Sequence, residues 1–348
     1  MAKSPRIQDI SELANVAPST VSHVLNGTAS ISDEVSERIL AAARETGYLA
    51  KRRRKAAVAL LPTVLLAASE ANFPKSDRNY VSWTMLNAFR QECRNRSIRL
   101  IPQIDPGDKI IPENLVNAIE RHKPQGVAIM QDDNYELIDA VHDLDPSIVI
   151  LSGQDPSMRV DTVSPGNRFA AQMATDYLFR LGHRRIAHVT YGTRLIGQHR
   201  KMGFLEAYRE SAHRMPPGAI IDVETFRPEV VTRNMLNWLS AQPRPLPFTA
   251  FFCAADNVAI GVMAALAEVG IKVPEDVSVL GFDNVESGKR QNPPLSTIHV
   301  PMEEIGHVAL NLLEEARTLP KNERSARRVE LGCRVVVRGT TAGPARSG

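Results

Sequence analysis

The sequence has few cysteines and no long apolar run. Its three cysteines are far apart and form no CxxC pair, so they indicate no disulfide framework. The longest apolar stretch, residues 56–68, has about 13 residues and contains Pro62, whereas a membrane-spanning helix needs about 20. A secretory signal would lie at the extreme N-terminus, well before this stretch. We therefore expect a protein without a membrane segment that works in the reducing cytoplasm.

Motifs that mark many enzymes are also missing. The sequence has no GxxxxGK[ST], GxSxG or HExxH pattern and no glycine-rich dinucleotide turn. Its nine histidines are scattered, and His183 in LGHRR fits the entry to a strand better than a metal site. We therefore expect no catalytic residues, no metal site and no cofactor.

The positive charge of the chain is unevenly distributed. The net charge is +3, and residues 1–57 hold nine Lys/Arg against six Asp/Glu, so the rest of the chain is balanced. Five of those nine cations are consecutive, from Lys51 to Lys55. A basic surplus confined to one end of a chain indicates a polyanionic partner that meets that end only.

Three short helices are predicted ahead of these cations, at about 7–14, 18–26 and 33–45. Pro18 suits the first position of the second helix, and Ser32 is a candidate N-cap for the third. Two helices separated by a tight turn and followed by a third describe a helix-turn-helix domain, whose second helix reaches base edges in the major groove. Apolar residues recur on one face of the first two helices: Ile7, Ile10, Leu13 and Ala14, then Val21, Val24 and Leu25.

The segment IQDISELANVAPSTVSHVLNG, residues 7–27, resembles the DNA-binding domain of the LacI/GalR family of bacterial transcription regulators. The resemblance covers nearly the whole chain. It implies a cytoplasmic, homodimeric repressor that binds a double-stranded DNA operator and responds to a small-molecule effector, a sugar or a related metabolite. Further motifs follow in the family's order: LGHRRIAHVT (181–190), CAADNVAIG (253–261), VPEDVSVLGFDN (273–284) and PPLSTIHVPMEEIG (293–306).

Two departures from the family pattern affect the expected DNA-binding surface. Ala17 occupies a position that usually holds Ser, which removes a side-chain N-cap worth about 1 kcal/mol. His23 stands where the family usually has Arg, the residue that reads guanine through two hydrogen bonds. A neutral His makes one weaker contact, so the operator should differ from the common one, unless His23 is a solvated side chain that faces no base. The residues that the resemblance places on DNA are Pro18, Ser19, Thr20, Ser22, His23 and Asn26.

Residues 50–62 correspond to the hinge of the family, which inserts a Leu into the minor groove. Here Ala57 lies near the Leu position, and a methyl group cannot wedge open a base step as larger apolar side chains do. We expect instead that the basic run makes phosphate contacts that do not depend on sequence, and a solvated charged linker is the alternative. The cations concerned are Lys51, Arg52, Arg53, Arg54 and Lys55.

Beyond the hinge the chain alternates short apolar runs with amphipathic stretches, a pattern that predicts an α/β fold with parallel sheets. Buried strands are predicted at about 64–68, 98–101, 126–130, 147–151, 186–190, 249–253, 277–281 and 333–337. Helices are predicted, for example, at 80–96, 166–181, 198–211, 257–269 and 302–317.

The resemblance implies how these elements are grouped. A helix-turn-helix domain of residues 1–49 and the hinge would precede a core of the periplasmic-binding-protein type at 63–340. That core would consist of two subdomains, one of residues 63–162 plus 295–325 and the other of 163–292 plus 326–340.

The resemblance also implies an effector cleft between the subdomains. Arg200 and Asp283 match the family's cleft Arg and carboxylate, and a structural ion pair is the alternative. Asp256 matches the acid of the family's Asn-Asp pair, but Ala255 replaces the Asn. The candidate aromatic residues are Phe226, for stacking on the effector, and Trp83 and Tyr80, either for the opposite wall or as ordinary core residues.

Two other functions are compatible with this architecture. A solute-binding protein for transport has the same core, but it needs an export signal and has no use for residues 1–57. A regulator controlled by a partner protein has the same domains, and measuring operator binding in the presence of metabolites would distinguish it from the leading hypothesis.

Overall fold

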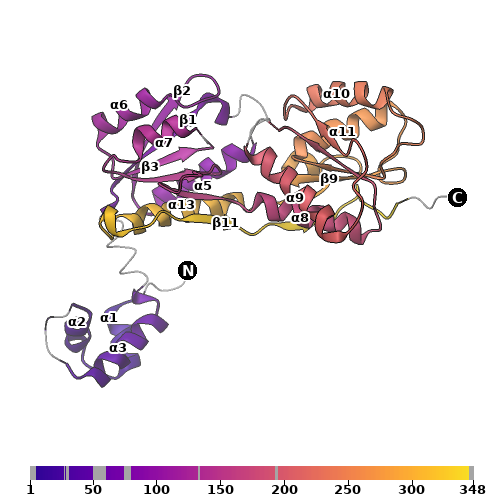
Figure 1. The fold of residues 1–348 in the computed structure, drawn as a ribbon. Helices are drawn as coiled ribbons and strands as arrows, with labels where there is room; N and C mark the ends of the chain where they lie inside the picture. Colours follow the sequence, from indigo (N-terminus) through magenta and orange to yellow (C-terminus); the bar gives the residue numbers. More distant parts are fainter. Residues whose placement is uncertain are drawn as a thin grey trace.

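The computed structural model describes residues 5–26, 28, 31–49, 60–73, 80–131, 134–192 and 195–344 (Figure 1). Near the N-terminus three helices, α1 (Ile7–Ala14), α2 (Pro18–Asn26) and α3 (Asp33–Glu45), form a small domain, as the sequence predicts. Its core is a cluster of buried side chains contributed by all three helices: Ile10, Ala14, Val21, Ile39, Ala42 and Ala43.

One local prediction in this domain is wrong, and a second is confirmed in position only. Leu13 was expected on the apolar face of α1, but half of its surface is exposed, because residue 13 lies at the edge of that face. Ser32 does precede α3, but its side chain makes no capping hydrogen bond within the described part of the domain. The positive end of α3 is instead favoured by Asp33 and Glu34 in its first turn.

The first subdomain of the core is a six-stranded parallel sheet covered by helices on both faces. α5 (Tyr80–Asn95) and α13 (Met302–Ala316) pack on one face, and α6 (Pro112–His122) and α7 (Tyr135–Val141) on the other. Side chains of β1 alternate between the two faces, as period-2 strand geometry requires. The strand order is β11 (Arg328–Leu331), β5 (Asp161–Pro165), β4 (Ser147–Leu151), β3 (Gly126–Met130), β1 (Thr63–Ser69) and β2 (Arg99–Asp105).

The second subdomain repeats this arrangement with one antiparallel edge strand. Its neighbouring strands are parallel except for the pair of β10 and β12. The strand order is β12 (Arg334–Val336), β10 (Ser296–His299), β9 (Ser278–Asp283), β8 (Ala250–Cys253), β6 (Ile186–Thr190) and β7 (Ile220–Asp222). Its helices are α8 (Asn167–Arg180), α9 (Leu195–Ser211), α10 (Pro228–Ser240), α11 (Asp256–Glu268) and α12 (Glu286–Lys289).

The chain crosses between the two sheets three times, and the crossings lie later in the sequence than we expected. β5 belongs to the first sheet, so the first crossing follows residue 165, not 162. β10 belongs to the second sheet and β11 to the first. The second crossing therefore lies near residue 300, and the third lies between 331 and 334. The expected boundaries at 295 and 325 are corrected by this strand pairing, which depends on partners distant in the sequence.

The three cysteines are free thiols, two of them buried and Cys333 half-buried. Burial raises the pKa of Cys93 to about 12 and that of Cys333 to about 11. These thiols are therefore protonated and unreactive near neutral pH. Among the helices in the described ranges, none is both long enough and apolar enough to span a bilayer.

Candidate functional site

The exposed surface of α2 carries the residues that the sequence analysis assigned to DNA. Val21 is fully buried and anchors the helix to the core of the small domain. The opposite surface presents positions at i, i+4 and i+8, which lie above one another on a helix. Of the assigned residues, Pro18, Ser19, His23 and Asn26 are exposed, and Thr20 and Ser22 are half-buried.

Hydrogen bonds orient two of these side chains. Asn26 Nδ2 donates to Ser22 Oγ at 3.2 Å. His23 Nδ1 lies 2.9 Å from Thr28 Oγ1, which follows the end of α2. The sequence analysis missed Thr28, because it lies outside the predicted helix and only the turn after Asn26 brings it back to the ring.

The basic run Lys51–Lys55 and Ala57 lie outside the described residues. The description of the chain resumes at Leu60, which is 45% exposed, and Leu61, which is fully buried. Leu61 lies two residues before β1 and belongs to a buried cluster that extends through both subdomains.

Arg200 on α9 lies at the centre of a buried polar cluster in the second subdomain. Its Nε donates to Asn167 Oδ1 at 3.0 Å, and its Nη1 donates to the carbonyl oxygen of Ala254. Its Nη2 pairs with Asp283 Oδ1 at 3.3 Å. The guanidinium also lies 3.7 Å from the ring centre of Phe282. The ends of β5, β8 and β9 therefore hold this side chain in one orientation.

The two carboxyl groups of the cluster have different environments. Asp283 is 7% exposed, and burial raises its pKa to about 6 although the charge of Arg200 opposes the shift. Asp283 also adopts a φ of 118°, a backbone conformation that L-residues rarely adopt and that is concentrated at functional sites. Asp256 is fully buried, and burial followed by the charge of Asp283 raises its pKa to about 8.

Asp256 supports the strand that carries Asp283. It accepts hydrogen bonds from Thr297 Oγ1 at 2.5 Å and from the amide of Val285 at 2.8 Å. A Cβ atom on Gly281 would lie only 2.2 Å from Asp256 Oδ1, so only glycine allows the strand to approach this carboxyl. These contacts of Asp256 are with protein groups, and its contact with an effector stays a prediction.

The predicted aromatic residues Phe226 and Trp83 lie in different surroundings. Phe226 packs edge-to-face against Tyr191 with ring centres 5.3 Å apart, and Tyr191 follows the carboxyl end of β6. Trp83 instead packs against Phe73 at 6.2 Å, in a groove between α5 and β2. Tyr80 is the first residue of α5, and its side chain lies outside the described part of the structure.

A cavity of about 390 Å³ lies beside Asp283 and is lined from both subdomains. Thr84 of α5 and the first turn of α13 face it from the first subdomain, and Asn284 and His299 face it from the second. A further contact joins the subdomains nearby, where Gln154 Nε2 lies 3.2 Å from His199 Nδ1. Gln154 follows the carboxyl end of β4, where ligands of parallel sheets bind, and this signal could have identified it from the sequence.

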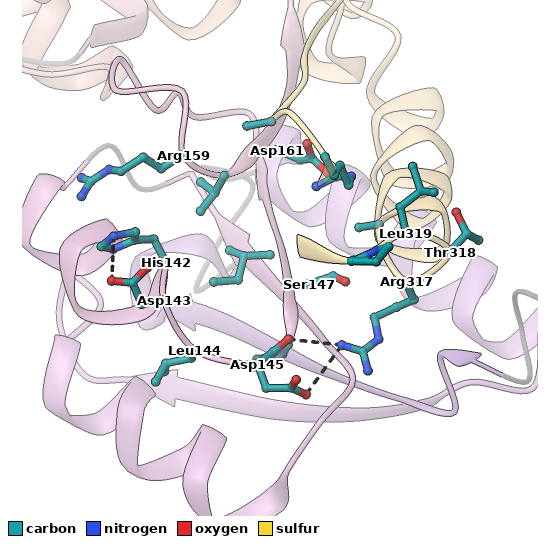
Figure 2. Close-up of a pocket in the computed structure, with 17 residues that line it drawn as sticks. His142, Asp143, Leu144, Asp145, Ser147, Arg159, Asp161, Arg317, Thr318 and Leu319 are labelled. Carbon is teal, nitrogen blue, oxygen red and sulfur yellow. Dashed lines mark hydrogen bonds and ion pairs between the residues drawn. The ribbon is translucent and has the colours of Figure 1, made fainter. Parts of the chain in front are cut away.

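A larger cavity, of about 900 Å³, lies at the amino ends of β4 and β5 (Figure 2). Figure 2 shows Arg317 paired with Asp145 across it, at 3.6 Å. Two other arginines of its lining are also paired, Arg159 with Asp139 and Arg324 with Asp161. We favour the smaller cavity beside Asp283 as the candidate ligand site, because it is lined from both subdomains and lies at the carboxyl ends of β9 and β10, where ligands of parallel sheets bind.

Comparisons with known proteins agree with these two regions. Residues 6–50 match the family "Bacterial regulatory proteins, lacI family", and residues 175–341 match "Periplasmic binding protein-like domain". The HTH-type transcriptional repressor PurR of Salmonella arizonae is 30% identical over 345 residues, which cover 98% of each chain. The ribose operon repressor of Haemophilus influenzae is 28% identical over 323 residues, which cover 92% of this chain and 94% of that one.

Two solved structures are similar in fold. A lac repressor dimer bound to operator and an anti-inducer has a TM-score of 0.69 at 19% identity and covers 98% of this chain and 100% of its own. A complex of the transcriptional regulator CelR with cellobiose has a TM-score of 0.68 at 23% identity and covers 97% of this chain and 100% of its own.

Proposed function

Because the chain belongs to the lacI family of bacterial regulatory proteins, we propose that it is a transcriptional repressor whose operator affinity is controlled by a small molecule. The exposed surface of α2 enters the major groove of the operator. The effector binds between the two subdomains, beside Arg200 and Asp283. The observation that carries the proposal is the combination of this exposed helix with a buried polar cluster between the two sheets of the core.

The residues of α2 support a specific interaction with DNA. Ser19, His23 and Asn26 are exposed polar side chains on one surface of a nine-residue helix. Side chains of this kind form hydrogen bonds with base edges in the major groove, whereas phosphate contacts carry no sequence information. The basic run at 51–55 adds the charge that phosphate contact requires.

The chemistry beside Asp283 supports a polar effector with hydroxyl groups. A carboxylate accepts hydrogen bonds from hydroxyl groups, and the guanidinium that pairs with it fixes its orientation. Asn284, His299 and Thr84 add neutral donors and acceptors around the cavity. One relative is named as the repressor of the ribose operon, and one similar structure is a complex with cellobiose. The effector class that we propose for this chain is a sugar or a related metabolite.

An effector in this position controls DNA binding by changing how the subdomains meet. Gln154 and His199 belong to different subdomains, so their 3.2 Å contact exists in only one relative arrangement of the two. An effector that prefers this arrangement raises the ratio of the two populations by at most the ratio of its affinities for them. The population of dimers that can bind the operator changes with it.

We also propose that two chains associate through the groove between α5 and β2. β2 is an edge strand of the first sheet, and the groove beside it has a volume of about 450 Å³. Its lining is mostly apolar, which is typical of the buried centre of a homodimer interface. The residues concerned are Leu66, Phe73, Trp83, Leu86, Arg90, Cys93, Arg94, Ile98, Leu100, Pro102 and Ile104.

Selection of binding sites from random duplex DNA tests this function. The full-length protein should enrich a sequence with two related half-sites, because a symmetric dimer presents two copies of α2. Fluorescence anisotropy with that sequence should then reveal a sugar or a related metabolite that changes operator affinity. A protein that enriches no sequence would refute the DNA-binding proposal. Control by a small molecule would be refuted if no metabolite changed the operator affinity but the proteins of a cell extract did.

A further inference from the structure

Thr28 contacts His23, the residue that the proposed function assigns to base recognition. Thr28 Oγ1 lies 2.9 Å from His23 Nδ1, and the amide of Thr28 donates to the carbonyl of His23 at 3.1 Å. Both residues are exposed. The backbone bond returns the chain toward the end of α2, and this return brings the hydroxyl group to the imidazole ring.

Engaging one nitrogen of an imidazole ring determines what the other nitrogen can do. A threonine hydroxyl can donate or accept. If Thr28 donates to Nδ1 of the neutral ring, the ring proton lies on Nε2. If Nδ1 instead carries the proton and donates to Thr28, Nε2 of the neutral ring is an acceptor. The first arrangement leaves the outer nitrogen as a hydrogen-bond donor, and the second does not.

We propose that Thr28 is a positioning residue for operator recognition: its hydroxyl group donates to Nδ1 of His23, so that Nε2 donates one hydrogen bond to guanine in the major groove. This inference rests on the proposed function, in which α2 enters that groove. Guanine presents two neighbouring acceptors there, O6 and N7, whereas adenine presents N7 beside an amino donor. Thymine presents one acceptor, O4, beside its methyl group, so a donor on a fixed ring has the most acceptors within reach at guanine.

Three variants of full-length protein test this role by selection of binding sites from random duplex DNA. Thr28→Val keeps the shape of the side chain but removes the hydroxyl, Thr28→Ser keeps the hydroxyl, and His23→Ala removes the ring. We expect the parent to prefer guanine at one position of each half-site. Thr28→Val should reduce that preference about fivefold, the effect of one hydrogen bond of about 1 kcal/mol, and Thr28→Ser should restore it. Binding to non-specific DNA should be equal for all of them.

The possible outcomes separate this inference from the function on which it rests. A guanine preference that survives Thr28→Val but disappears in His23→Ala overturns the role of Thr28 and leaves the function intact. A parent protein that selects no sequence refutes the function itself. If Thr28→Val also loses non-specific binding, the domain has been damaged, and Thr28→Ala then decides. A guanine preference retained by Thr28→Ala overturns the proposal, and a loss of that preference alone supports it.

Discussion

The helix-turn-helix domain and the α/β core place their candidate functional residues in opposite environments. His23 and Ser19 lie on the exposed surface of one nine-residue helix. Arg200 and Asp283 are buried, and the groups that contact Arg200 belong to three distant residues, Asn167, Ala254 and Phe282. Substitutions on the exposed surface of α2 can therefore change DNA recognition without loss of stability, whereas a substitution of Arg200 affects both effector binding and folding.

The largest effect is expected from Arg200→Ala. This change leaves the buried carboxylate of Asp283 without its cation, and breaking a buried pair in this way costs about 3–5 kcal/mol. We expect chemical denaturation followed by circular dichroism to show this loss in the core transition. If the variant still folds, its operator affinity without effector should remain, because α2 is unchanged, but its response to effector should be lost.

Arg168→Ala is the matched control for this change. Arg168 also forms an ion pair, with Glu206 of α9, but about half of its side chain is exposed. We expect little change in the stability of the core and a normal response to effector. Equal destabilisation by the two substitutions would contradict the contrast between buried and exposed positions.

A second large effect is expected on the stability of the core at acidic pH. His188 is fully buried between the rings of Phe204 and Phe252, and burial lowers its pKa to about 3. In the unfolded chain the pKa of His188 is near 6.5, so as the pH falls the unfolded state takes up a proton before the folded state does. The contribution of His188 to the free energy of unfolding is therefore fully present above about pH 6.5 and is lost as the pH falls toward 3. Through this one group the free energy of unfolding changes by at most about 1.4 kcal/mol per pH unit.

The variant His188→Phe isolates this contribution from the carboxyl groups that titrate in the same range. Between pH 6.5 and 4, the free energy of unfolding should fall more steeply in the parent than in the variant. Parallel pH profiles for the two proteins would show that His188 takes up no proton on unfolding, and the assignment would be wrong.

The smallest effect on stability is expected from Ser19→Ala. Ser19 is exposed near the start of α2, and surface substitutions away from special contacts change stability by about 0.5 kcal/mol or less. Loss of one hydrogen bond to the operator should nevertheless weaken specific binding about fivefold, with non-specific binding unchanged. A variant with parental operator affinity would mean that Ser19 contacts no base or phosphate.

The sequence alone was sufficient for much of the fold and for the surface of α2. Strands such as β1, β3 and β8 consist largely of apolar residues, and the three N-terminal helices follow from local spacing and from Pro18. In contrast, β5, β10 and β11 are short and carry polar or charged residues, for example Asp161, Thr297 and Arg328. Their assignment to a sheet depends on hydrogen bonds to strands far away in the sequence, so no local pattern identified them.

The candidate effector site shows the same division. The motifs were enough to bring Arg200 and Asp283 forward as a pair, and the structure joins them at 3.3 Å. In contrast, the contacts of Asp256 with Thr297 and of Trp83 with Phe73 depend on the tertiary structure. A motif specifies which residue type stands near a strand end, but the direction of a side chain depends on the neighbours that pack around it, and these come from elsewhere in the chain.

Thr28 and Gln154 are the clearest cases of what the tertiary structure decided. Neither belongs to a motif, and each lies in a segment that follows a helix or a strand. Their partners, His23 and His199, are brought to them by a turn in one case and by the meeting of two subdomains in the other. Short-range periodicity determines helices and strands because it acts within a few residues. Hydrogen bonds between such segments depend on the folded arrangement of the whole chain.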